Sequence, residues 1–195
     1  MNKLHQFLKT RRSIRRFKPD PVPAHVMEAI LHTSTFAPSA HNLQPWRFVQ
    51  VESDSAKEKL GNALTTKMRT DMELEGALQA DIQKRIKISL RRISEAPIII
   101  ILCRDIEAIR ENKREDEIMG IQSIALAGLQ LLLAAEAEKV SGNWICWVLY
   151  AQKETISALE LPKNWLPEAM LFLGYADEEP EDAKHHTHEN LTIKR

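Results

Sequence analysis

The segment RRSIRRF at residues 11–17 and the segment APSAHNLQPW at residues 37–46 indicate the fold and the site more strongly than any other part of the sequence. The first gathers four guanidinium groups around one hydroxyl, and guanidinium forks pair bidentately with phosphate. The second is rich in turn-forming residues and carries two side-chain amides, which both donate and accept hydrogen bonds. Together the two segments predict a clamp for a phosphate and fixed amides for a planar, polar heterocycle.

Each segment also has a purely structural interpretation. The arginines could form a solvated basic turn, they could stabilise the C-terminal end of the first helix through their positive charge, or they could bind nucleic acid. The second segment could be a loop in which Asn42 caps a turn and Trp46 begins a core strand. Basic and acidic residues number 27 each, so no extended positive face for nucleic acid is expected. The occurrence of both segments at this spacing favours a ligand site.

The composition is that of an ordinary soluble globular protein, with 44% hydrophobic and 28% charged residues. A length of 195 residues suits one domain over residues 1–195. Cys103 and Cys146 both lie in apolar runs, which predicts free thiols and a reducing, cytoplasmic setting. The first ten residues lack the apolar stretch of a signal peptide. The long apolar run Ile118–Ala137 contains four polar residues, so we expect a core or interface helix rather than a membrane span.

The order of predicted elements gives an α+β protein in which a mainly antiparallel sheet is flanked by helices. Helices are expected over residues 2–12, 23–35, 53–64, 115–139 and 152–159, and strands over residues 46–51, 97–103 and 168–175. Residues 65–95 are charged and helix-prone, which predicts a helical excursion or a lid. Residues 175–195 contain nothing to build a core and are expected to form a C-terminal arm.

Several common catalytic motifs are absent from the sequence. None of the six glycines belongs to a G-x-G-x-x-G or P-loop pattern, and no zinc-protease or nucleophile-elbow motif is present. Cys146 has no identifiable base and reads as a packed thiol, and His185, His186 and His188 read as solvated tail residues rather than metal ligands. We therefore expect no catalytic side chain and no metal, and an organic cofactor that carries the chemistry.

The arginine segment and the turn-rich segment described first give the sequence a resemblance to a known family: it resembles the nitroreductase superfamily of FMN-dependent oxidoreductases. The resemblance is carried by RRSIRRF and by PSAHNLQPWRFV, and it extends over nearly the whole chain. The C-terminal half, from SGNWICW at residues 141–147 to LGYA at residues 173–176, is similar to the flavin domain of the deazaflavin-coenzyme gamma-glutamyl ligase. The resemblance implies a homodimer with composite FMN sites, the long apolar helix at its interface, and a C-terminal tail exchanged between subunits.

The resemblance also implies roles for particular residues. One group matches positions that hold the phosphate, ribityl chain and pyrimidine edge: Arg11, Arg12, Ser13 and Arg15. A second group matches the segment that reaches the flavin largely from the other subunit: Pro38, Ser39, Ala40, Asn42 and Gln44. A third group matches the stretch beside the ring: Ile145, Cys146 and Trp147. A basic tail residue is expected to complete the phosphate clamp, with Lys184 and His186 as first candidates beside Lys194 and Arg195.

The implied function is an NAD(P)H oxidoreductase that reduces small electron-poor acceptors, such as nitroaromatics or quinones, in ping-pong turnover. The sequence leaves the choice between NADH and NADPH open. A flavoenzyme linked to deazaflavin-cofactor maturation and a flavin-binding protein without turnover are the alternatives. Neither nucleic acid nor a membrane is expected as a partner.

Overall fold

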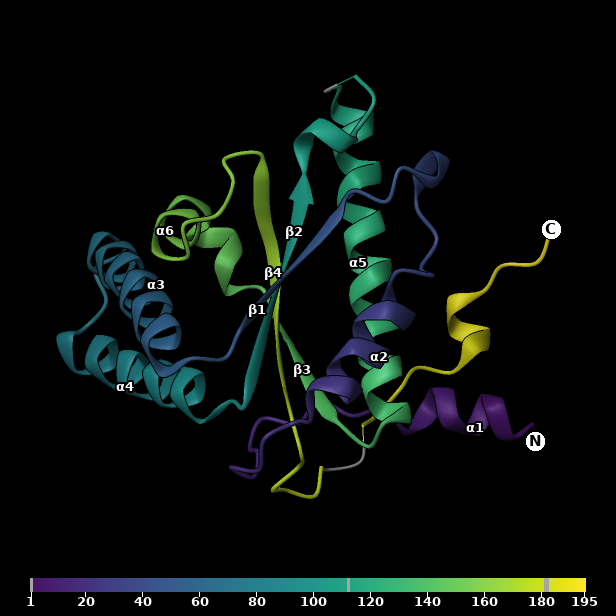
Figure 1. Ribbon diagram of the computed structural model, residues 1–195, viewed down its shortest axis with the longest axis horizontal. Coiled ribbons are helices and arrows are strands. Elements are labelled where there is room, and N and C mark those ends of the chain that lie inside the picture. Colours follow the sequence, from purple (N-terminus) through teal and green to yellow (C-terminus); the bar gives the residue numbers. More distant parts are fainter. Residues whose placement is uncertain (1, 112, 181–182) are drawn as a thin grey trace.

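The computed structural model describes residues 2–111, 113–180 and 183–195 (Figure 1). Its centre is a four-stranded antiparallel sheet in the order β1-β2-β4-β3. The strands are β1 (Trp46–Val51), β2 (Ile98–Asp105), β3 (Ser141–Ile145) and β4 (Trp165–Gly174). The continuous β-branched run of β2 is buried along its whole length, as expected for a strand covered on both faces.

Helices cover both faces of the sheet (Figure 1). On one face lie α2 (Ala24–Ser34) and α5 (Arg114–Ala137), and on the other α3 (Asp54–Leu74), α4 (Gln79–Glu95) and α6 (Gln152–Ala158). Successive residues of a strand point to opposite faces, so Ile98 and Ile100 of β2 join one core cluster while Ile99 and Ile101 join the other. The α+β class and the antiparallel sheet flanked by helices are confirmed.

The excursion at residues 65–95 consists of two packed helices. Ser53 caps α3 by accepting a hydrogen bond from the Ala56 N–H, and the helix continues to Leu74, well beyond the predicted end at Leu64. After a turn at Gly76, which has a positive φ of 76°, the chain returns as α4. We refer to α3 and α4 together as the α3–α4 hairpin.

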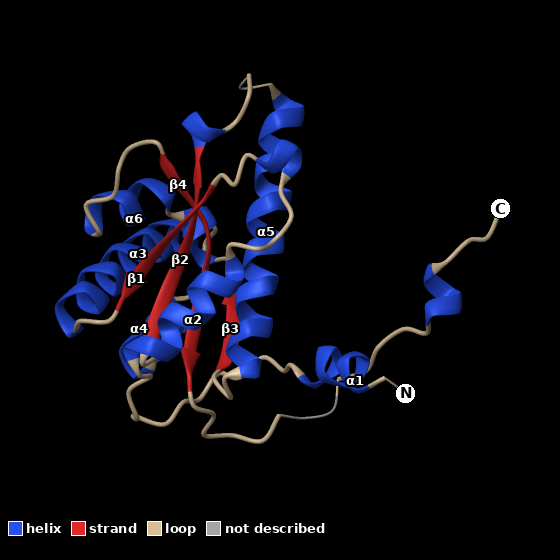
Figure 2. Cartoon of the chain, turned by 45° about the vertical axis from the view of Figure 1, so that its right-hand side comes forward, coloured by secondary structure: helices blue, strands red, loops and turns tan. Residues whose placement is uncertain are grey.

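Residues 11–18 run along one end of the sheet. Ser13 forms a bridge with Gly142 of β3, and Phe17 forms one with Ala176, directly after β4. Ile14 between them is buried and donates its N–H to the Gly142 carbonyl. The helix before this segment, α1 (Lys3–Thr10), and the C-terminal residues project away from the sheet (Figure 2).

Helix α5 lies close against the sheet on one side and is exposed on the other. A Cβ atom at Gly128 would lie 2.2 Å from the Trp144 ring, so only glycine permits this approach. Along the same helix, Ile118, Ile121, Leu126 and Leu129 are 42–48% exposed. By length and composition α5 could cross a membrane, but half of its apolar window is buried against the sheet and α2.

Candidate cofactor site

The predicted arginine cluster lines a cleft of about 670 Å³ beside the end of the sheet. Arg11, Arg12, Ser13 and Arg15 all border this cleft, as does Arg16. The Arg12 side chain donates to the Lys9 carbonyl of α1 and the Arg15 side chain to the Ser13 carbonyl, which holds both guanidiniums close to the main chain. The structure therefore brings the first predicted group together. We call this space the anion cleft.

An acidic side chain already occupies the main-chain donors of this cleft. The Glu178 carboxylate accepts hydrogen bonds from the N–H groups of Arg15 and Arg16, and it lies 3.5 Å from the Arg16 guanidinium. These contacts, led by the Arg15 N–H, lower the pKa of Glu178 against the opposing effect of burial. Because a carboxylate binds there, the donor set of residues 15–16 is one that holds an anion.

The second predicted segment forms a strained loop before β1. His41, Asn42 and Gln44 have positive φ values of 51°, 55° and 50°, a left-handed conformation that costs about 1 kcal/mol or more for residues other than glycine. The loop is tied by hydrogen bonds from the Gln44 N–H to the Ser39 hydroxyl and from the Gln44 amide to the Asn42 amide oxygen, both 3.0 Å. Strain held by the surrounding structure is typical of ligand clamps.

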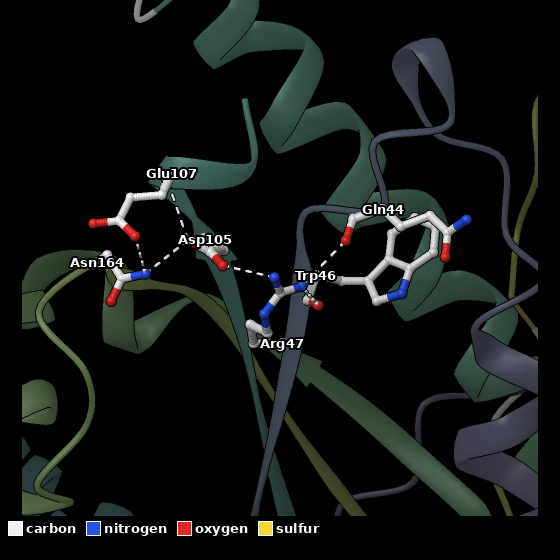
Figure 3. A network of polar contacts seen from close by, with 6 residues as sticks. All are labelled: Gln44, Trp46, Arg47, Asp105, Glu107 and Asn164. Atoms are coloured by element: carbon white, nitrogen blue, oxygen red, sulfur yellow. Dashed lines mark hydrogen bonds and ion pairs between the residues drawn. The ribbon is translucent and has the colours of Figure 1, made fainter. Parts of the chain in front are cut away.

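A polar network fixes the end of this loop to the sheet (Figure 3). The Arg47 guanidinium donates to the Gln44 and Trp46 carbonyls and pairs with Asp105 at 2.6 Å. The other oxygen of Asp105 accepts from the Glu107 N–H and the Asn164 amide, at 3.1 and 2.9 Å. The network connects the start of β1, the end of β2 and the residue before β4. The main chain at Gln44 is therefore held in place by the sheet.

The third predicted group, Ile145, Cys146 and Trp147, lies where β3 ends. Ile145 and Trp147 are half-buried against the core on the α3–α4 side. The prediction that Cys146 is a packed thiol is wrong: Cys146 is exposed, and its Sγ accepts a hydrogen bond from the Trp144 indole at 3.1 Å. Gly142, which pairs with Ser13, lies three residues earlier in the same strand. Strand geometry separates these two points by about 10 Å, so β3 links the anion cleft to the Ile145–Trp147 segment.

The arginine cluster and the strained loop lie at opposite ends of the sheet (Figure 1). Ser13 pairs with Gly142, which lies level with Ile98 at the start of β2. Trp46, directly after the loop, pairs with Arg104 near the end of β2. Six residues of a strand span about 20 Å. Within one chain, Asn42 and Gln44 therefore do not reach the cleft of Arg11 and Ser13.

The predicted tail residues do not converge on the anion cleft of their own chain. His185 and Ala183 border the cleft, whereas Lys184 and His186 are exposed and lie outside its lining. In residues 2–111, 113–180 and 183–195, no group of three or more His, Cys, Asp or Glu side chains is arranged to hold a metal.

Two features of the site were missed by the sequence reasoning. Glu178 lies in the predicted C-terminal arm, for which no acidic site residue was predicted, and the pairing of Phe17 with Ala176 brings it to the arginines. Arg47 and Asp105 lie 58 residues apart and carry no motif. Arg47 lies in the predicted strand 46–51 and Asp105 lies just beyond the predicted strand 97–103, and the sequence predicts no pairing between these strands.

Comparisons with known proteins agree with this architecture. A match to the nitroreductase family covers residues 8–175. YfhC of Bacillus subtilis (strain 168), an inferred NAD(P)H nitroreductase, is 32% identical over 184 residues, 93% of this chain and 88% of that protein.

Two solved structures share the fold at low sequence identity. A BluB-like flavoprotein from Clostridium difficile 630 gives a TM-score of 0.83 at 20% identity and covers 100% of both chains. An inferred nitroreductase from Desulfovibrio desulfuricans, solved in complex with FMN, gives 0.76 at 23% identity and covers 100% of this chain and 98% of that one. The family match, the relative and the shared fold lead to one conclusion: the chain belongs to the nitroreductase family and is an oxidoreductase of that family.

Proposed function

We propose that the protein is an FMN-dependent NAD(P)H oxidoreductase that reduces small electron-poor acceptors, such as nitroaromatics or quinones, in ping-pong turnover. The observation that carries the proposal is the placement of the arginine-lined anion cleft at one end of β3 and of Ile145–Trp147 at the other. A phosphate in the anion cleft and a ring beside Ile145–Trp147 would fit a mononucleotide whose phosphate and ring are joined by an extended linker. The FMN complex of the Desulfovibrio relative and the name of YfhC support it.

The residues present fit FMN. The anion cleft is lined by four guanidiniums and by the carboxylates of Asp177, Glu178 and Glu179, and Glu178 occupies the N–H groups of Arg15 and Arg16. The side chains of Arg11, Arg12, Ser13 and Arg15 would therefore hold the phosphate and ribityl chain. When bound, FMN supplies the ability to accept and return a hydride, and the protein contributes binding, orientation and electrostatics. Amide donors near the pyrimidine edge would favour the negative charge that reduction creates.

The site is proposed to be complete only in a homodimer. The strained loop and the anion cleft of one chain lie about 20 Å apart along the sheet, so Pro38, Ser39, Ala40, Asn42 and Gln44 would reach the ring from the second subunit. A dimer with α5 at its centre would cover the exposed apolar side of that helix. The arm at 175–195 would wrap the partner, where Lys184 or His186 would complete the phosphate clamp.

The remaining expectations are part of the same proposal. Residues 1–195 would form one domain, the excursion at residues 65–95 would border the acceptor side of the ring, and the enzyme would work in the cytoplasm. No catalytic side chain is proposed, because the hydride chemistry takes place on the cofactor.

The test is the visible absorption spectrum of the purified protein before and after anaerobic addition of NADH or NADPH. We expect bound flavin that bleaches with at least one of the two donors, followed by recovery of the spectrum when a nitroaromatic or quinone is added. Colourless protein that takes up no added FMN would overturn the proposal.

The two alternatives give different results in this experiment. Protein that holds FMN but is reduced by neither nicotinamide would favour a flavoenzyme linked to deazaflavin-cofactor maturation. Bound flavin that is reduced but passes electrons to none of the acceptors would favour a flavin carrier.

A further inference from the structure

A second cleft, of about 750 Å³, opens between the α3–α4 hairpin and the segment that follows β3. Its volume is within the range of small-molecule sites. Ile145, Cys146 and Trp147, the residues proposed to lie beside the flavin ring, form part of its lining. The cleft is therefore where a second small molecule could approach the proposed ring position. We call it the hairpin cleft.

Two arginines of α4 face the hairpin cleft without a charged partner. Arg85, Ser89 and Arg92 occupy positions i, i+4 and i+7, which share one face of a helix, and all three line the cleft. The buried face of α4, which carries Ile82, Ile86 and Ile93, lies directly beside this face. Within the described part of the chain, neither guanidinium makes an ion pair or a hydrogen bond, although both lie on a helix rich in charged neighbours.

The other charges of the lining do not neutralise these arginines. Lys67 and Asp71 of α3 pair with each other, one helical turn apart, so their charges cancel. Glu75, near the hairpin turn, is the one acidic side chain of the lining outside that pair, against two guanidiniums. The hairpin cleft therefore carries a net positive charge, which attracts anions.

The rest of the cleft suits an aromatic ring. Met68 and Met72 of α3 and Ile88 of α4 give it apolar walls, and Trp147 contributes an aromatic side chain. Methionine side chains adapt to the shape of a ligand, and they make favourable contacts with aromatic rings. Apolar walls with two guanidiniums fit a planar aromatic molecule that carries an anionic group.

We infer that the hairpin cleft is the acceptor site and that Arg85 and Arg92 select planar aromatic acceptors carrying a carboxylate or a similar anion. The inference deepens the proposed function and rests on it, because the acceptor must lie beside the ring. It assigns the α3–α4 hairpin a role in specificity.

The experiment compares 4-nitrobenzoate with its neutral analogue 4-nitrobenzamide in the Arg85→Gln, Arg92→Gln double variant. We expect KM for 4-nitrobenzoate to rise about tenfold, a typical loss for a charge-assisted hydrogen bond, with little change for 4-nitrobenzamide. Lys84→Gln is the matched control, since Lys84 is an exposed cation of α4 outside the lining, and it should alter neither KM. Equal changes for both acceptors in the double variant would overturn the inference. So would a rise confined to the KM of NADPH, which would assign the arginines to the donor phosphate.

A binding measurement separates this inference from the proposed function. Calorimetric titration of the purified full chain with 4-nitrobenzoate needs no turnover, so it decides the inference even if neither nicotinamide reduces the protein. Weaker binding in the double variant than in the wild type and in Lys84→Gln supports the inference. The same affinity in all three proteins, or no binding to any of them, overturns it.

Discussion

Arg11 lies half-buried in the lining of the anion cleft and is the first residue to test at the smallest scale. Arg11→Ala removes one guanidinium fork from the proposed phosphate site, which should weaken FMN binding by about 2–3 kcal/mol. Flavin titration of the apoprotein by fluorescence measures the loss. Lys18→Ala, an exposed cation outside the cleft, is the control and should bind FMN normally. Unchanged affinity in Arg11→Ala would remove this residue from the phosphate site.

The two cysteines should differ sharply in reactivity. Burial, with a smaller effect of Glu168, raises the pKa of Cys103 to about 12, so its thiolate is scarce at neutral pH, whereas Cys146 is exposed. We expect one thiol per folded chain to react quickly with iodoacetamide, and Cys146→Ser to abolish that reaction. Saturating FMN should slow it, because Cys146 is proposed to lie beside the ring. A labelling rate that FMN leaves unchanged would place the ring elsewhere.

Glu178 should make the stability of the native state depend on pH. Its pKa is lowered in the folded protein, chiefly by the Arg15 N–H, so its stabilising contribution is complete above the carboxyl pKa of the unfolded chain. The contribution is lost as the pH falls through the lowered pKa of the folded state. Wild type should therefore have a higher Tm than Glu178→Gln at pH 7, and the difference should vanish in strong acid. Glu179→Gln is the control, and a Tm difference for Glu178→Gln that persists in acid would contradict the assignment.

At the scale of elements, the sequence predicted the type of most helices and strands but missed strand β3 and misplaced several ends. The strand expected over residues 97–103 continues to Asp105, because Arg104 and Asp105 are buried with partners. Arg104 pairs with Glu168 at 2.7 Å and Asp105 pairs with Arg47 at 2.6 Å. In the sequence, a charged residue after an apolar run predicts that the buried strand ends there. Here each charge is neutralised inside the protein by a partner that is distant in sequence, so the strand continues.

The candidate site shows the same division between local and distant information. The arginine segment and the turn-rich loop were visible because each is contiguous and chemically unusual. The sequence alone did not show that they occupy opposite ends of the sheet, nor that Glu178 occupies the donors of Arg15 and Arg16. The first fact depends on strand register, and the second on a contact between residues 15–16 and residue 178 that exists only in the folded protein.

A larger side chain at Gly128, where helix α5 packs against strand β3, should destabilise the protein. In Gly128→Ala the new Cβ would lie 2.2 Å from Trp144 and 2.7 Å from Leu102, both within the core. Overpacking of this kind costs about 1–3 kcal/mol or more, so denaturant unfolding should show a clear loss of stability. Gly61→Ala on α3 is the control, because its Cβ would meet the flexible end of Leu90 at 3.0 Å while gaining helix propensity. Equal stability of the two variants would mean that α5 can shift away from β3.

At the scale of the whole molecule, α5 and both terminal segments carry exposed apolar side chains, although others, such as Leu74 on the α3–α4 hairpin, lie elsewhere. Leu126 and Leu129 project from α5, Leu4 and Leu8 from α1, and Leu191 and Ile193 from the C-terminal arm. The last two groups belong to segments that extend away from the sheet (Figure 2). Exposed apolar surface on several elements at once is typical of an oligomer interface.

A charge on the exposed side of α5 should therefore dissociate the proposed dimer and weaken FMN binding at the same time. In Leu129→Glu a buried, unpaired carboxylate at the proposed interface would favour the monomer. The monomer would hold the anion cleft without the loop at residues 38–44, because the two lie at opposite ends of its sheet. Mass measurement by light scattering and flavin titration on the same sample should show both losses. Leu74→Glu, at a more exposed leucine on the α3–α4 hairpin, should remain dimeric and loaded. A monomeric Leu129→Glu protein that binds FMN with full affinity would mean that one chain holds the complete site, and a monomeric wild type would contradict the dimer itself.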